Sequence, residues 1–230
     1  MRLISGALAA ITFAGTPARS QQPAATDPVS VSPDKYKVLL ENDYVRVVDY
    51  TIKQGERDQP HSHPPKVSYV LSGGTLRIAP DGTDPFVVVE KDGNTTFMGT
   101  VSRHTAENVG TTPIRIILFE VKRVDGSAAP RAEDPAVVNP SSITVKLEND
   151  SVRVMEAVLP PGFNEKQHTH PNYAFYIVEG GTVRMHYPDG STRDAELEAG
   201  QVLFSDPVTH WAENTGSSTI RIVLVEVRKR

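Results

Sequence analysis

The sequence has no cysteine, a single tryptophan and no block of basic residues. Without cysteine the fold has no disulfide to stabilise it, and an oxidising compartment poses no risk to a free thiol. The formal net charge of −4 and the sequence pI near 6.0 give no positively charged surface for nucleic acid or for an anionic membrane. We therefore expect a small-molecule partner, and neither a nucleic acid nor a membrane.

The apolar stretch near the N-terminus is too short to cross a bilayer. Residues 1–20 have the three parts of a bacterial-type signal peptide: Arg2 as a short positive region, an apolar run from Leu3 to Ala14, and small residues around Arg19. A cytosolic amphipathic helix is the alternative, but the run has no polar face. The sequence predicts an exported, soluble protein that is periplasmic or secreted.

The sequence contains an internal repeat of one module. The segment LENDYVRVVDY at residues 40–50 recurs as LENDSVRVMEA at residues 147–157, and the same offset of 107 residues relates the glycines and histidines that follow. After one deletion the offset becomes 106. A stretch rich in Pro, Ala and Ser separates the copies, as is typical of a linker. The sequence predicts a flexible tether at 21–34, a first module at 35–122, a linker at 123–142 and a second module at 143–230.

A sustained helical period is absent from both modules. Short runs of Val, Ile, Leu and Phe alternate instead with Gly-Gly and Asp-Gly turns, which is the pattern of antiparallel hairpins. The sequence therefore predicts an all-β fold, built as a sandwich or as a double-sheet jelly roll.

Six of the seven histidines form two matching sets. Each set begins with a His-x-His pair followed by proline, and alternate residues on a strand point to the same face. A third histidine, from a later strand of the same module, can complete a facial set of metal ligands. The sets are His61, His63 and His104 in the first module, and His168, His170 and His210 in the second.

The spacing around these histidines resembles the two motifs of the cupin family. In the first module, Gly55-x5-His61-x-His63-x3-Val67-x6-Gly74 is similar to the first motif, with Val67 where the family has a glutamate. Gly93, His104 and Asn108 match positions of the second motif. The second module repeats both motifs, with Ala174 at the glutamate position. The resemblance covers nearly the whole chain beyond the tether, and it identifies the chain as a bicupin.

This resemblance implies two tandem double-stranded β-helix barrels, each with a metal held by its three histidines. Barrel histidines without a metal are the alternative. Three neutral imidazoles leave the charge of a dication uncompensated, so the remaining coordination positions favour an anionic ligand. Fe(II) is the metal that we favour, with Zn, Ni, Mn and Cu as alternatives.

Tyr69 and Tyr176 lie two residues beyond the missing glutamates, so strand alternation predicts that they share the inner face with that position. They are the candidate catalytic residues, because a phenol could donate a hydrogen bond to a bound anion; packing inside the barrel is the alternative. Glu107 and Glu213 lie three residues beyond a histidine, and we expect them to point away from the sites.

Three functions remain open. The first is a non-haem metal-dependent dioxygenase acting on a small anionic or enolisable substrate, although the bicupin flavonol dioxygenases use the glutamate that is missing here. The second is a non-catalytic cupin that binds or senses a small molecule. The third is a Zn-dependent hydrolase, for which the sequence shows no evident base. We expect a monomer or a homodimer, because two modules in one chain can supply the contacts that single cupins make by dimerising.

Overall fold

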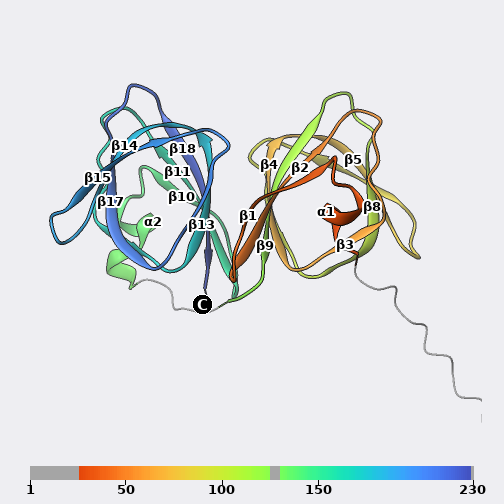
Figure 1. Cartoon of the computed structure of the whole chain (residues 1–230), viewed down its shortest axis with the longest axis horizontal. Coiled ribbons are helices and arrows are strands. Elements are labelled where there is room, and N and C mark those ends of the chain that lie inside the picture. Colours follow the sequence, from red (N-terminus) through yellow and green to blue (C-terminus); the bar gives the residue numbers. More distant parts are fainter. Residues whose placement is uncertain (1–25, 125–129, 229–230) are drawn as a thin grey trace, which may run out of the picture.

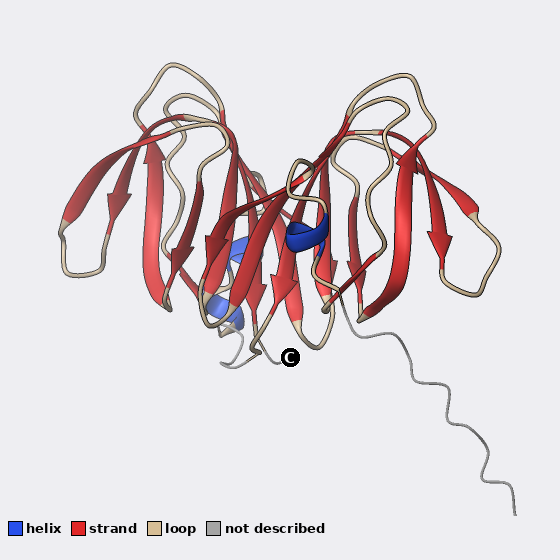
Figure 2. Ribbon diagram, turned by 45° about the vertical axis from the view of Figure 1, so that its right-hand side comes forward, coloured by secondary structure: helices blue, strands red, loops and turns tan. Residues whose placement is uncertain are grey.

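The computed structural model describes residues 26–124 and 130–228, and the predicted signal peptide lies outside these ranges. The described residues form two β-barrels that stand side by side, one for each module (Figure 1). Antiparallel strands make up nearly all of both barrels (Figure 2). Within the described ranges, no helix is both long enough and apolar enough to cross a membrane. The predicted all-β fold with two tandem barrels is confirmed.

The first barrel consists of two antiparallel sheets. The larger sheet has the strand order β1-β2-β9-β4-β7, and the smaller has the order β3-β8-β5-β6. The strands are β1 (Tyr36–Glu41), β2 (Val45–Ile52), β3 (His61–His63), β4 (Lys66–Ser72), β5 (Gly74–Pro80), β6 (Phe86–Glu90), β7 (Thr95–Met98), β8 (Val101–Asn108) and β9 (Ile114–Val121).

The second barrel repeats this plan strand for strand. Its larger sheet has the order β10-β11-β18-β13-β16, and its smaller sheet has the order β12-β17-β14-β15. The strands are β10 (Ile143–Glu148), β11 (Val152–Leu159), β12 (His168–His170), β13 (Tyr173–Glu179), β14 (Gly181–His186), β15 (Thr192–Leu197), β16 (Val202–Ser205), β17 (Val208–Asn214) and β18 (Ile220–Val227).

The two barrels agree even in their irregularities. The pairing of β1 with β2 shifts register between Val38 and Leu40, and the pairing of β10 with β11 shifts at the corresponding place. Gly55 and Gly162, in the loops that lead to the His-x-His strands, have φ values of 75° and 74°. This left-handed conformation favours glycine because other side chains are strained in it. The repeat in the sequence is therefore a repeat of the backbone.

The larger sheets of the two barrels pack against each other (Figure 1). One hydrophobic cluster includes Val67 and Phe119 from the first barrel together with Ala174 and Val225 from the second, and each of these four side chains is fully buried. At its border, the ring of Tyr44 stacks on a phenylalanine of the second barrel with centroids 5.4 Å apart. Each larger sheet is thus buried on both faces, one toward its own interior and one toward the other barrel.

A short helix precedes the first strand of each barrel: α1 (Pro28–Val31) and α2 (Pro135–Val138), the latter after the 3-10 turn η1 (Arg131–Glu133). The N-cap residue of each helix forms an ion pair with an arginine of its own barrel. Asp27 contacts Arg46 at 2.7 Å, and Asp134 contacts Arg153 through two guanidinium nitrogens.

These helices correct the predicted domain limits. The tether and the linker were predicted to lack structure, yet residues 26–34 and 130–142 are packed against the barrels as corresponding parts of the repeat. Each contains Asp-Pro at the same offset of 107 residues. The prediction is wrong here because these stretches are too short and too rich in Pro to show strand periodicity, although an ion pair fixes each of them.

Candidate metal centres

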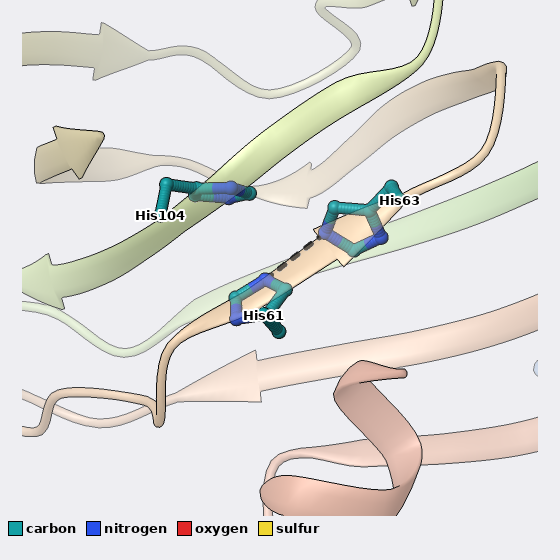
Figure 3. A group of neighbouring side chains, drawn as sticks. All are labelled: His61, His63 and His104. Carbon is teal, nitrogen blue, oxygen red and sulfur yellow. Dashed lines mark hydrogen bonds between the residues drawn. The ribbon is translucent and has the colours of Figure 1, made fainter. Parts of the chain in front are cut away.

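The three predicted histidines of the first barrel meet in its interior. His61 and His63 alternate along β3, and both side chains are buried. The antiparallel pairing of β3 with β8 sets His104 opposite His61. One ligand nitrogen from each ring lies within 4.8 Å of the other two. Figure 3 shows the three rings together, with His61 Nε2 and His63 Nε2 3.1 Å apart.

The second barrel brings its own three histidines together in the same way. His168 and His170 alternate along β12, and the pairing of β12 with β17 sets His210 opposite His168. All three rings are buried, and their ligand nitrogens satisfy the same 4.8 Å limit. The structure therefore contains two three-histidine clusters, each supplied by two neighbouring strands.

Backbone carbonyls orient three of these rings through Nδ1. His61 Nδ1 lies 2.8 Å from the carbonyl oxygen of Gln59, and His168 Nδ1 lies 2.8 Å from that of the residue two positions before it. His104 Nδ1 lies 2.9 Å from the carbonyl oxygen of Ser102. A carbonyl oxygen only accepts hydrogen bonds, so Nδ1 of His61 and of His104 carries the hydrogen, and Nε2 of each neutral ring presents a lone pair. His168 Nδ1 also lies 3.1 Å from Asn139 Nδ2.

Buried carboxylates orient two further rings. His63 Nδ1 lies 3.2 Å from Glu120 Oε1, and His170 Nδ1 lies 2.9 Å from Glu226 Oε1. Although burial alone raises the pKa of Glu120, the hydrogen bonds from His63 and Arg46 lower it overall. An ionised carboxylate fixes the hydrogen on Nδ1 as a carbonyl does, and it makes the imidazole a better metal ligand.

This donor set fits a divalent transition metal. With Nδ1 protonated in both rings, His61 and His63 direct two Nε2 lone pairs at each other across 3.1 Å, with no hydrogen between them. A cation placed between the rings turns that repulsion into two bonds. Two imidazole nitrogens that bind one metal at about 2.1 Å and at right angles lie about 3 Å apart, close to the observed separation.

Burial keeps the metal-facing rings neutral. It lowers the pKa of His63 to about 3, with a smaller contribution from the charge of Lys66. Burial and the neighbouring histidines lower the pKa of His168 to about 4 and that of His210 to about 2. Neutral imidazole is the form that binds metal, so the rings need not lose a proton at neutral pH.

The candidate catalytic tyrosines do not face the metal sites, and their predicted role is wrong. Tyr69 and Tyr176 belong to the cluster between the barrels, and Tyr69 Oη lies 3.2 Å from a carboxylate oxygen of Glu156 in the other barrel. Val67 and Ala174 lie on the same outward face. The prediction failed because it took the positions of Val67 and Ala174 to face the barrel interior, whereas these residues lie in the cluster between the barrels.

The residues that point inward on these strands differ between the barrels. In the first, buried Lys66 donates to Ser68 Oγ at 3.1 Å, and burial lowers the pKa of the lysine to about 8. In the second, Tyr173 and Phe175 occupy these positions and stack with ring centroids 5.3 Å apart. A cation thus stands near the first triad, where the second has aromatic rings.

The interior of the first barrel is filled beside its triad. Tyr36 and Tyr50 are cross-strand partners whose rings stack 4.4 Å apart. Both hydroxyl groups donate to Asp58 Oδ2, at 2.9 and 3.1 Å, and Asp58 Oδ1 accepts from a backbone N–H. Tyr36 Oη also lies 3.1 Å from His61 Nε2. The phenol therefore lies directly against a nitrogen that faces the metal position.

The interior of the second barrel is hollow. The residues that correspond to the two tyrosines are Ile143 and Ala157, which are again cross-strand partners. Both line a cavity of about 340 Å³ whose wall includes the three histidines of this barrel. Most of the lining is apolar, and Arg193 and Glu165 are among its few charged residues. The second barrel thus has a metal-ligand set and space for a small molecule beside it.

Glu107 and Glu213 form ion pairs away from the histidine clusters. Glu107 contacts Arg77 at 3.3 Å, and Glu213 contacts His186 at 3.0 Å, both on the outer face as predicted. The ring of Trp211 stacks on His186 with centroids 5.1 Å apart.

Sequence reasoning missed four acidic residues near the sites. Glu120 and Glu226 are each the one acid in a mostly apolar final strand, and Asp58 and Glu165 each precede the His-x-His pair by three residues. In both cases an acid recurs at the offset of the repeat. That recurrence was the available signal, because a buried acid in a repeated position needs a partner inside the barrel.

Residues 155–226 match the cupin domain family. A variant of Bacillus subtilis oxalate decarboxylase superposes with a TM-score of 0.60 at 14% identity, over 85% of this chain and 73% of that one. A further structure of that enzyme, described by its Mn(II) centres, gives 0.59 at 12% identity, over 86% and 76%. AerE from Microcystis aeruginosa gives 0.54 at 13% identity, over 84% and 97%. No curated protein matches the sequence.

At these identities the solved structures establish the fold and not the activity. The family match lies in the second barrel, and the first barrel repeats its strand order, its register and its histidine triad. The second barrel therefore matches the cupin domain family, and the chain has the bicupin fold, two tandem cupin barrels with a three-histidine cluster in each.

Proposed function

We propose that the protein is a metal-dependent oxygenase whose second barrel binds and converts a small, weakly acidic or anionic molecule. The observation that carries this proposal is the cavity of about 340 Å³ that meets His168, His170 and His210. Its size is in the range of small-molecule sites, and its lining combines an apolar wall with few polar groups, as such sites do.

The lining indicates the chemical class of the substrate. Arg193 is the one arginine or lysine in it, while leucine, isoleucine, valine and aromatic side chains supply most of the wall. A compact dianion would find little to compensate its charge there. An apolar body with a single ionisable oxygen fits better, because that oxygen can approach the three histidines while the body contacts the wall.

The histidines supply the reason for an anionic head group. Three neutral imidazoles would leave both positive charges of a bound divalent metal uncompensated, so an enolate, phenolate or carboxylate is favoured in the remaining positions. A bound metal would supply Lewis acidity, and Fe(II), the metal that we favour, would also supply the redox chemistry that O2 requires. Zn, Mn, Ni and Cu also bind imidazole.

Oxygen uptake tests this function. Protein loaded anaerobically with Fe(II) is mixed with a panel of diketones, phenols and thiols, and we expect O2 consumption with at least one apolar, enolisable compound. His168→Ala/His170→Ala should abolish it, whereas the matched pair His61→Ala/His63→Ala should retain it. Absence of uptake across the panel with any metal would contradict an oxygenase. Turnover without O2 would indicate a lyase or a hydrolase, and binding without turnover would indicate a sensing cupin.

We also propose that the protein is exported, because of the signal-like residues 1–20 and the lack of cysteine. Fractionation of a bacterium that expresses the full-length chain should recover a shortened protein outside the cytoplasm. A full-length product confined to the cytoplasm would contradict export.

A further inference from the structure

We propose that Glu165 is a catalytic residue of the second barrel, the proton acceptor that ionises a weakly acidic O–H of the ligand as it binds beside the three histidines. This inference rests on the proposed function, since it assigns the base for the same cavity. It concerns a carboxyl group at a position that the first cupin motif leaves unspecified, between Gly162 and His168, in the loop between β11 and β12.

The position of Glu165 gives it access to the ligand. Its side chain lines the cavity whose wall also includes His168 and His210. The loop that carries it is held by a backbone hydrogen bond from Glu165 N to the carbonyl oxygen of Ala212, at 2.9 Å. Glu165 is not one of the three clustered histidines, so it can take up or release a proton without loss of a metal ligand.

The hydrogen bonding of Glu165 leaves one of its two carboxyl oxygens available to a ligand. Among residues 26–124 and 130–228, its carboxyl group accepts one hydrogen bond, to Oε2 from the N–H of Ala212 at 3.2 Å. Oε1 is thereby left for a ligand in the cavity. Burial raises the pKa of this carboxyl to about 7, with no compensating cation. A carboxyl group in such surroundings takes up a proton near neutral pH more readily than an exposed one.

In the first barrel, the acidic residue at the corresponding position has a structural role. Asp58 corresponds to Glu165, but it accepts hydrogen bonds from Tyr36, Tyr50 and the N–H of Ala106. Its carboxylate is fully engaged, and the tyrosines fill the space that a ligand would need. In the second barrel both tyrosines are absent, and the longer glutamate extends into the space that they vacate.

The proton transfer is balanced within the cavity. The neutral ligand enters with its O–H intact, that bond breaks, and the proton passes to Oε1 of Glu165. The electron pair stays on the ligand oxygen, which becomes the anion that three neutral histidines and a divalent metal favour. No proton leaves the site, and the neutral carboxyl group can return it to the product. The ligand class is an enol, a hydroxyketone or a phenol.

Calorimetry with maltol tests this assignment. Maltol is a small hydroxyketone with one weakly acidic O–H, and Zn(II) avoids its oxidation. The Zn(II)-loaded full chain is titrated with maltol at about pH 8, above the pKa of about 7 of Glu165, in two buffers that differ in ionisation enthalpy. We expect almost no proton release to the buffer from the wild type and about one proton per ligand from Glu165→Gln.

Matched variants separate this role from a structural one. Asp58→Asn, at the corresponding position of the first barrel, should leave the proton count unchanged. Glu165→Asp retains a carboxyl group and should restore part of the proton uptake. All three variants should keep the zinc content of the wild type, measured by elemental analysis. An equal proton count for wild type and Glu165→Gln would overturn the assignment of Glu165. A zinc-loaded wild type that binds no maltol would overturn the proposed ligand class and the assignment together.

Discussion

The two barrels share one backbone and one arrangement of histidines, but their interiors differ. In the first, Tyr36 and Tyr50 fill the space beside the triad and hold Asp58 with their hydroxyl groups. In the second, Ile143 and Ala157 leave a cavity of about 340 Å³ at the same place. The shared features supply a set of metal ligands in each barrel, and the differences replace two stacked tyrosines by a cavity in the second.

Charge adds to this contrast. The first triad has the buried cation of Lys66 near it, whose charge contributes to the low pKa values of His63 and His104. A cation that disfavours protonated histidine also disfavours a metal dication. The second triad has Tyr173 at that position, with its ring 4.6 Å from that of His170. We therefore expect the second barrel to bind a metal more tightly than the first.

Removal of a His-x-His pair should have the largest effect. His168→Ala/His170→Ala leaves one imidazole in the second barrel, and one imidazole holds a divalent metal too weakly to survive dialysis. Elemental analysis after dialysis should show that the tightly bound equivalent is lost, whereas His61→Ala/His63→Ala should retain it. Retention of that equivalent in His168→Ala/His170→Ala would refute the ligand assignment.

Tyr50→Ala should be the most destabilising of the single substitutions considered. Tyr50 is 4% exposed, and its removal opens a void and leaves Asp58 with one phenol partner fewer. Loss of a large buried aromatic side chain costs about 3–5 kcal/mol. Urea denaturation should give a decrease in unfolding free energy of that size. Ala157→Gly, at the corresponding position, is the control, and an equal loss there would argue against a special role for the tyrosine pair.

Neutralising the carboxylates behind the histidines should have an intermediate effect. Glu226→Gln removes the charge that supports His170, and changes of this kind lower metal affinity by about 10- to 100-fold. Glu120→Gln makes the same change behind His63, where the contact is 3.2 Å instead of 2.9 Å. Competition with a zinc chelator measures both. Unchanged affinity in Glu226→Gln would mean that the charge of Glu226 does not strengthen metal binding by His170.

A decrease in pH should gradually lower the free energy of unfolding of the metal-free protein. The pKa values of His168 and His210 are lowered from 6.5 to about 4 and about 2, so below pH 6.5 the unfolded chain binds more protons than the folded one. The contribution of these neutral histidines to the free energy of unfolding is therefore fully present above pH 6.5 and is lost as the pH decreases toward 4. The free energy of unfolding falls by up to about 1.4 kcal/mol per pH unit for each histidine. Urea midpoints across this range, compared with those of His168→Ala/His170→Ala, would show a shallower slope in the variant. Equal slopes would contradict neutral burial.

The repeat in the sequence was sufficient to predict the fold and the six histidines. Each triad comes from one His-x-His strand and one later strand, and spacing alone shows this when it occurs twice. The sequence was not sufficient to orient β4 and β13. Val67 and Tyr69 are apolar yet point outward, and Lys66 is charged yet points inward. The second barrel buries the outer face, so the usual rule that the apolar face is the inner one fails.

The difference between the interiors was visible in the sequence only as unequal residues at equal positions. Tyr36 and Tyr50 align with Ile143 and Ala157, but nothing in the alignment shows that each pair is opposed across two strands. Because the two positions are partners across two strands, the smaller residues at both of them line the same cavity. Glu165 gains its significance in the same way, because its surroundings and not its own identity distinguish it from Asp58.

Equilibrium binding of maltol to the zinc-loaded protein, with Ala157→Tyr as the variant, tests most directly the claim that only the second barrel takes a metal and a ligand together. The variant restores a tyrosine where the first barrel has one, and it leaves all six histidines in place. We predict one maltol per chain for the wild type, and none for Ala157→Tyr at unchanged zinc content. Two per chain in the wild type, or full binding in the variant, would contradict the account.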